Sequence, residues 1–178
     1  YKRLTFERDV AHIKFAAVDN APGTYHVDVT FSDGQKLLEA TGEQPILRGD
    51  QFEIGAQVIK FLPVANMLGY DSIYRLEYLE GRDARRFSSD AVTDAQTNGI
   101  ALSQNPGLDV HALAEKEGKR FGIDAQYGSA TYQPMGDGFE YDVNITQDAL
   151  VARPTEATKA LIQKGAYPGF QPTNGGPK

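Results

Sequence analysis

Residues 124–154 constrain the fold of this chain more than any other stretch, because apolar and polar side chains alternate along them. Over residues 139–146 the apolar set is Phe139, Tyr141, Val143 and Ile145, and the polar set is Glu140, Asp142, Asn144 and Thr146. A period of two residues places the two sets on opposite faces of a β-strand. The Gly-Asp-Gly sequence at 136–138 predicts a tight turn, since glycine adopts positive φ without steric cost. We therefore predict a hairpin in which residues 139–146 pair with a strand that ends at Pro134.

Similar alternation predicts strands elsewhere. It is cleanest over residues 24–31, and the Ser-Asp-Gly turn at 32–34 predicts that residues 36–41 return as the antiparallel partner. Within residues 51–61 the apolar phase shifts by one residue near Val58. This shift predicts a β-bulge that lets the strand bend from one sheet layer to the other. Further strands are expected within residues 4–18 and at residues 72–80.

Two short helices are expected, one on each side of residues 124–154. Asp109 is a suitable N-cap for a helix over residues 111–120, and Thr155 is one for a helix that runs to Lys164. Residues 82–107 are polar and predict a long loop, whereas residues 166–178 predict a tail rich in proline and glycine. The sequence thus predicts one soluble α+β domain over residues 1–165. It is expected to be mainly antiparallel β, a sandwich or partly closed barrel of about seven or eight strands with two short helices.

Charge and cysteine content exclude several classes of function. The formal net charge is −6 and the isoelectric point is about 5.0, whereas a nucleic-acid-binding domain normally carries a basic face. The chain has no cysteine, so disulfides, thiolate metal sites and cysteine nucleophiles are excluded. Glycine-rich phosphate loops do not occur, and we expect no cofactor.

Two groups of side chains are candidate metal ligands. His26 and Asp28 lie on the polar face of the strand at 24–31, and Asp137, Glu140 and Asp142 form an acidic group. The acidic spacing does not match the twelve-residue calcium loop of an EF-hand. A site at His26 would need further ligands from other strands. A solvated surface is the alternative, and the more common, explanation for both groups.

Three arginines, Arg82, Arg85 and Arg86, are candidates for binding an anion or a lipid headgroup, with a solvated loop as the alternative. Ser129 follows a glycine, but the second glycine of a nucleophile elbow is missing and a strand is expected after it. The sequence therefore does not predict a serine hydrolase.

Four patches of sequence resemble one family. They are YKRLTFE at 1–7, GDQF at 49–52 with VIK at 58–60, ANMLG at 65–69 with YRLE at 74–77, and residues 124–154, above all YGSATY at 127–132 and LVARP at 150–154. Together they resemble a group of uncharacterised proteobacterial membrane proteins that are often labelled "cation/multidrug efflux pump". The resemblance implies a soluble domain that follows hydrophobic, membrane-spanning segments, in agreement with a sequence that begins at Tyr1 rather than at Met. It implies no catalytic residues, and at most an accessory role to a pump, since a domain of this kind has no transmembrane path for a substrate.

Residues and resemblance together predict a non-enzymatic, membrane-tethered domain of a Gram-negative bacterium, with a role in protein interaction or ligand binding. The expected partner is another membrane or envelope protein, and the expected membrane attachment lies upstream of Tyr1. The fold style favours the periplasmic side of the inner membrane, while the cytoplasmic side stays open. One alternative is a structural subunit that docks through a sheet edge or the C-terminal tail. Another is an enzyme that uses carboxylates and a histidine brought together by the fold.

Overall fold

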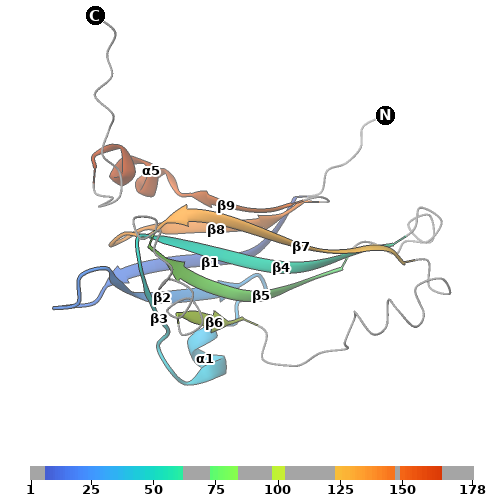
Figure 1. Ribbon diagram of the computed structural model, residues 1–178, viewed down its shortest axis with the longest axis horizontal. Helices are drawn as coiled ribbons and strands as arrows, with labels where there is room; N and C mark the ends of the chain where they lie inside the picture. The colour runs from blue at the N-terminus through green and yellow to red at the C-terminus, as the bar shows by residue number, and fades with distance from the viewer. Residues whose placement is uncertain (1–6, 62–72, 84–97, 103–122, 147–148, 166–178) are drawn as a thin grey trace, which may run out of the picture.

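Two antiparallel sheets face each other in the computed structural model, which describes residues 7–61, 73–83, 98–102, 123–146 and 149–165 (Figure 1). The five-stranded sheet has the order β3-β2-β1-β8-β9, and the four-stranded sheet has the order β6-β5-β4-β7. The strands are β1 (Arg8–Ala17), β2 (Thr24–Phe31), β3 (Ile46–Arg48), β4 (Gln51–Phe61), β5 (Ile73–Arg82), β6 (Gly99–Ala101), β7 (Ile123–Pro134), β8 (Glu140–Ile145) and β9 (Leu150–Pro154). The helices are α1 (Leu37–Thr41) and α5 (Glu156–Gln163). The predicted fold class, mainly antiparallel β in a sandwich, is confirmed.

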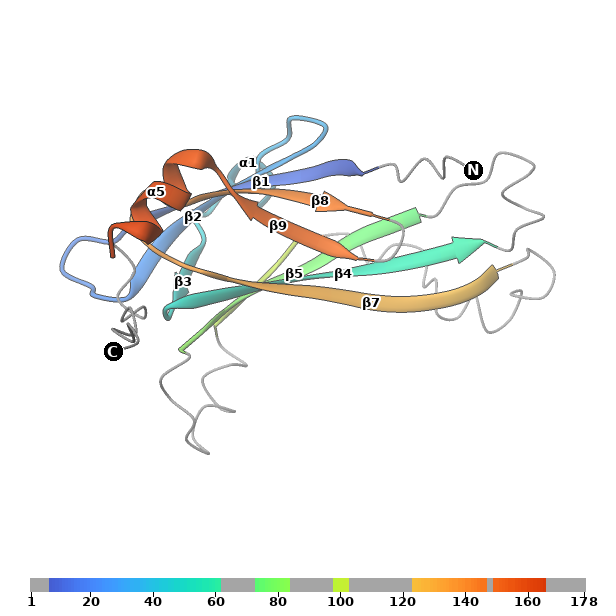
Figure 2. The same ribbon diagram turned by 90° about the horizontal axis from the view of Figure 1, so that it is seen from above.

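The core fills the space between the two layers, which Figure 2 shows from above. Each sheet turns the apolar side of its alternation inward: β2 buries Tyr25, Val27 and Val29, and β8 buries Tyr141, Val143 and Ile145. Phe52 from the four-stranded sheet packs against both Phe15 and Tyr141 of the other sheet, with ring centroids 4.9 and 5.0 Å away. These three rings are fully buried and join the two layers.

The predicted hairpin within residues 124–154 is wrong, although both of its strands exist. β7 pairs with β4 in one sheet, and β8 pairs with β1 and β9 in the other. Between them the chain crosses from sheet to sheet: the Met135 N–H donates to the Asp50 carbonyl (2.8 Å) and the Gly138 N–H to the Phe15 carbonyl (2.9 Å). Met135 and Phe139 are fully buried, so this connection closes one end of the core rather than turning in solvent.

Two details of the predicted strands also differ. Residues 36–41 do not form a strand: apart from a single bridge between Lys36 and Thr30 they form the short helix α1, and β2 pairs with β1 and β3 instead. The irregularity expected near Val58 is present as two register shifts, at Gly55/Ala56 against β5 and at Lys60/Phe61 against β7. However, β4 does not pass between layers, because it pairs with β5 and β7 throughout.

Helix α5 forms as predicted, with the Thr155 side chain accepting the Thr158 N–H as its N-cap. The buried Thr158 hydroxyl accepts the Glu140 N–H (2.8 Å), which fixes α5 against β8. The helix predicted over residues 111–120 and the tail 166–178 lie outside the described residues. Neither helix in the described part of the chain is long and apolar enough to cross a bilayer.

The predicted long loop, residues 82–107, contains the short strand β6, and Asn98 just before it links the two sheets. The Asn98 amide donates to the carbonyls of Arg48 (2.6 Å) and Gly81 (3.0 Å), while its oxygen accepts the Arg48 N–H (3.0 Å). On the other side of the sandwich, the Gln133 amide donates to the Ala152 carbonyl (2.9 Å) and so links β7 to β9. The sheets are thus bonded near both edges without forming a closed barrel.

Candidate functional site

Most of the candidate metal ligands share one surface, the outer face of the five-stranded sheet. His26 and Asp28 lie on β2, and Glu140 and Asp142 lie on β8, but β1 runs between these strands. Lys14 of β1 stands opposite both Asp28 and Glu140 in the register, so a cationic side chain separates the two acidic ones. The structure therefore brings the two candidate groups to one face without joining them.

Cross-strand polar contacts account for much of this face. The Lys14 ammonium lies 3.5 Å from the Glu140 carboxylate, and His12 Nδ1 lies 2.8 Å from Asp142 Oδ1. Asp28 accepts from the Gln44 amide (3.0 Å), and Asp137 accepts the Ala17 N–H (2.8 Å) in the connection before β8. Among the residues that the structure describes, no group of three or more His, Asp or Glu side chains is placed to hold a metal ion.

Of the three candidate arginines, only Arg82 lies in the part of the chain that the structure describes. Arg82 is exposed at the end of β5, and its guanidinium carbon lies 4.5 Å from the centre of the Tyr132 ring. Such stacking is a favourable cation–π contact. Arg85 and Arg86 lie outside the described residues. Ser129 lies within β7 opposite Ala56, so its backbone is that of a strand on both sides.

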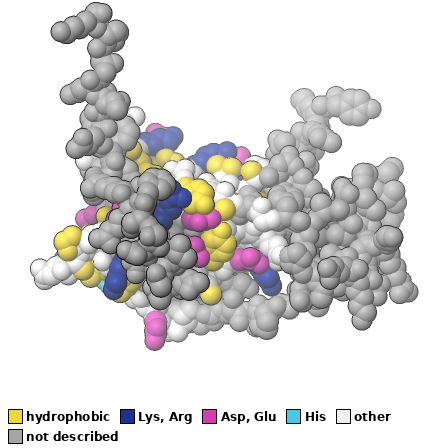
Figure 3. Space-filling view, viewed as in Figure 1, with side chains coloured by type: hydrophobic (Ala, Val, Ile, Leu, Met, Phe, Trp, Pro, Cys, Tyr) yellow, Lys and Arg dark blue, Asp and Glu magenta, His cyan; other side chains and the backbone are white. Residues whose placement is uncertain are grey.

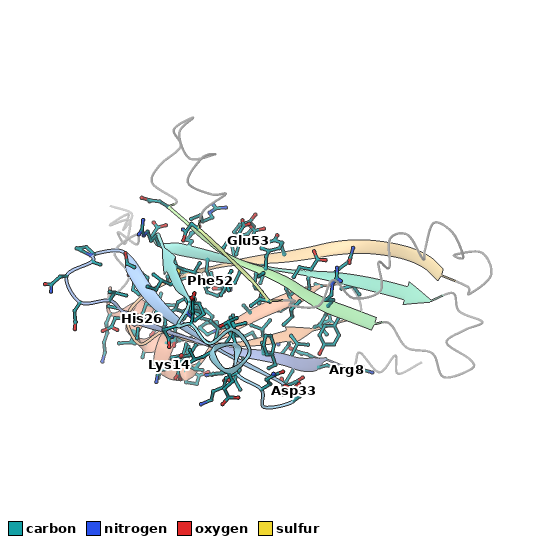
Figure 4. All side chains as sticks on the ribbon, turned by 90° about the horizontal axis from the view of Figure 1, so that it is seen from below. Arg8, Lys14, His26, Asp33, Phe52 and Glu53 are labelled. Carbon is teal, nitrogen blue, oxygen red and sulfur yellow. The ribbon has the colours of Figure 1, made fainter. Side chains whose placement is uncertain are left out.

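A different set of side chains gathers on the outer face of the four-stranded sheet. We call it the carboxylate–tyrosine face, and its members are Glu53, Tyr78, Glu80, Arg82 and Tyr132. Glu53 in the central strand β4 stands opposite Glu80 on β5 and opposite Tyr132 on β7. Figure 3 views this side of the molecule and shows acidic side chains directly beside hydrophobic ones. Figure 4 places Glu53 on the side of the sandwich away from Lys14 and His26, with Phe52 between.

Tyr78 is held flat across its neighbouring strand. It stands opposite Gly55, and a Cβ at Gly55 would lie only 2.2 Å from the Tyr78 ring, so the ring occupies the space that a side chain would need. Its hydroxyl donates to Glu53 Oε1 (2.9 Å). Burial and this bond to the Glu53 carboxylate raise the pKa of Tyr78. Tyr78 therefore remains a protonated hydrogen-bond donor to Glu53.

Glu80 is the carboxylate of this face without a partner. It makes no hydrogen bond or ion pair with another residue in the described part of the chain. Partial burial and the charge of Glu53 raise the pKa of Glu80. Like charges that stand directly opposite on neighbouring strands repel each other. The face therefore holds two adjacent carboxylates, one bonded and one unbonded.

Glu80→Gln is expected to raise the free energy of unfolding by about 0.2–1 kcal/mol at pH 7, because it removes one of two opposed like charges. A raised folded-state pKa means that the wild-type protein loses stability as Glu80 ionises with rising pH. The gain should therefore shrink toward pH 4, where Glu80 takes up a proton in both the folded and unfolded states. Urea denaturation of the wild-type protein and the variant between pH 4 and pH 7 measures this difference in the free energy of unfolding.

The matched control is Glu156→Gln, which removes the same charge from an exposed site. Glu156 lies in the first turn of α5 and is 2.9 Å from the Lys159 ammonium, so its loss should lower stability slightly. A fall in stability for Glu80→Gln at pH 7 would show that the Glu80 charge is favourable where it stands.

Comparison with known protein families, with curated proteins and with solved structures gave no significant match. The carboxylate–tyrosine face was missed from the sequence because its members come from three segments whose pairing the sequence does not state. Glu53 falls in the polar phase of residues 51–61, but Glu80 falls in the same phase as the apolar residues Tyr74 and Leu76, so the alternation alone does not place it on the outer face. The register shift at Gly55/Ala56 brings it beside Glu53.

Proposed function

We propose that this chain is a non-enzymatic interaction domain that binds a partner protein through the carboxylate–tyrosine face. We also propose that it is tethered to the inner membrane of a Gram-negative bacterium and that its partner is an envelope protein. The resemblance in sequence supports these two points. We propose that the domain lies on the periplasmic side of the inner membrane rather than on the cytoplasmic side.

The observation that carries this proposal is the exposed Tyr132 with Arg82 stacked on it. Tyr132 exposes 48% of its surface, the most of any large hydrophobic side chain in the described residues. Tyrosine and arginine are enriched among the residues that dominate protein–protein binding energies. The outer face of the other sheet has a different character, since lysine and histidine there pair with carboxylates on the neighbouring strand.

The carboxylates of the proposed binding face lie apart from the histidines. The two histidines in the described residues, His12 and His26, lie on the five-stranded sheet, whereas Glu53 and Glu80 lie on the opposite side of the sandwich. Glu53 and Glu80 therefore cannot act together with either histidine. His12 does pair with a carboxylate, Asp142, but the two stand side by side on the outer face of the five-stranded sheet, away from the proposed binding face.

Site-specific photo-cross-linking tests the proposal. A benzophenone amino acid at position 132 of the full-length protein, in its own membrane, is expected to form a discrete adduct with one envelope protein. The same amino acid at position 28, exposed on the opposite face, serves as the control. We expect the adduct at least tenfold more strongly from position 132. Equal yields from the two positions, or no adduct from position 132, would refute binding through this face.

A further inference from the structure

We propose that the partner presents a lysine or arginine side chain that sits on the Glu53–Glu80 pair, beside the ring of Tyr78. This inference rests on the proposed function and specifies the chemistry of the partner. It commits to a basic side chain of a protein as the occupant of the carboxylate–tyrosine face.

Charge complementarity is the first argument. Glu53 and Glu80 are a directly opposed pair, and residues so placed have Cβ atoms about 4.5–5.5 Å apart. One ammonium or guanidinium group can therefore contact both carboxylates. Arg82 is the nearest cation in the register, opposite Gln51, but its guanidinium lies over the Tyr132 ring. The pair is left with excess negative charge on a chain whose net charge is −6.

The five-stranded sheet has a cation between its carboxylates, which the Glu53–Glu80 pair lacks. On the five-stranded sheet, Lys14 of β1 stands between Asp28 of β2 and Glu140 of β8, so cation and anion alternate across the strands. On the four-stranded sheet, the corresponding position across from Glu53 is another carboxylate, Glu80. A basic side chain from outside would restore the alternation that the five-stranded sheet already has within one chain.

Aromatic rings supply the second argument. The face of a tyrosine ring attracts a cation within about 6 Å of its centre. Tyr132 already holds one, because Arg82 lies over it. Tyr78 is fixed by its hydroxyl bond to Glu53 and by its close contact with Gly55, so its ring needs no reordering when a cation arrives. Pre-organisation of this kind lowers the entropic cost of binding.

A protein is a better occupant than a free amine or a lipid. The groups lie on the outer face of a sheet and are half-buried or exposed, so a small amine alone would gain few contacts. A protein side chain arrives with a surrounding surface that covers Tyr132 and excludes water from the ion pair. Anionic lipid headgroups would be repelled by the two carboxylates.

A peptide titration followed by NMR tests whether a basic side chain binds at the Glu53–Glu80 pair. Pentalysine is added to the ¹⁵N-labelled chain, with penta-Nε-acetyl-lysine as the uncharged equivalent. We expect shifts centred on Glu53, Tyr78 and Glu80 with pentalysine and none with the acetylated peptide. Glu80→Gln should weaken the binding at least fivefold, and Glu156→Gln, which removes the same charge from α5, should leave it within a factor of two. Shifts spread over the whole surface, or equal effects of the two substitutions, would overturn the inference in favour of bulk charge.

The cross-linking experiment separates this inference from the function on which it rests. Adduct formation from position 132 should fall at least fivefold when Glu80→Gln is added. If the adduct persists undiminished, binding through the face stands and the basic side chain is rejected. If the parent protein gives no adduct from position 132, the proposed function itself is rejected, whatever the peptide titration shows.

Discussion

Gly49→Ala is expected to lower the free energy of unfolding by about 3–5 kcal/mol, the sum of backbone strain and a steric clash. Gly49 has a φ of 124°, a region that residues with a Cβ rarely adopt. A Cβ there would lie 2.2 Å from the Arg82 carbonyl oxygen. Since typical domains are stable by 5–15 kcal/mol, the variant should be largely unfolded at moderate urea concentrations.

The clash cannot be relieved locally, because the sheets are tightly bonded at this point. The Arg82 carbonyl accepts the Asp50 N–H (3.0 Å), and Asn98 bridges Arg48 and Gly81. Gly81 faces the same junction, where its own Cβ would lie 2.2 Å from the Arg48 carbonyl oxygen. Making room at Gly49 would therefore break hydrogen bonds that hold β3 to β5.

Gly23→Ala provides the control for backbone strain alone. Gly23 has a φ of 73°, and a Cβ there would meet nothing within 4 Å. Its cost should stay near 1 kcal/mol, the lower end of the range for a strained backbone. Urea denaturation of the two variants measures the difference. Equal costs would show that the junction tolerates a methyl group and that only φ matters.

The sequence predicted the features that depend only on local alternation of apolar and polar residues. The buried faces of β2 and β8 follow from the period of two alone, and both were predicted correctly. The N-cap Thr155 was also predictable, because a cap depends on the next few residues only. The choice of strand partner is different. β7 and β8 are neighbours in sequence, yet β7 takes β4 and β8 takes β1, because Met135 and Phe139 gain more by burial between the sheets than as an exposed turn.

The candidate site was harder to predict than the fold for the same reason. Glu53 meets Glu80 only in the particular register of β4 with β5, and that register shifts at Gly55/Ala56. A shift by one residue reverses which side chains share a face. The residues singled out as ligands, such as Asp28 and Glu140, lie on one face, but the sequence does not reveal that β1 would place Lys14 between them.

Phe52→Ala is expected to cost about 3–5 kcal/mol in the free energy of unfolding, the usual range for removing a buried aromatic side chain. Phe52 is fully buried, and its ring contacts those of Phe15 and Tyr141 from the facing sheet. The alanine would leave a cavity between the layers, and the junctions at Asn98 and Gln133 limit how far the sheets can close over it. Urea denaturation should show a lower midpoint with an unchanged slope.

Two further variants test whether this loss of stability comes from the lost volume in the core and whether a ring on the outer face matters as much. Phe52→Leu keeps most of the volume and should cost less than half as much, unless the ring contacts themselves dominate. Tyr132→Ala removes a ring from the outer face of the same sheet and should lower stability by no more than about 1 kcal/mol, the value of an exposed cation–π contact such as that with Arg82. Phe52 and Tyr132 would then separate scaffold from the proposed binding surface: the first variant loses stability, whereas the second keeps its stability and is expected to lose the proposed partner. A loss of stability at Tyr132 comparable to that at Phe52 would instead make Tyr132 part of the scaffold and remove the main support for binding through this face.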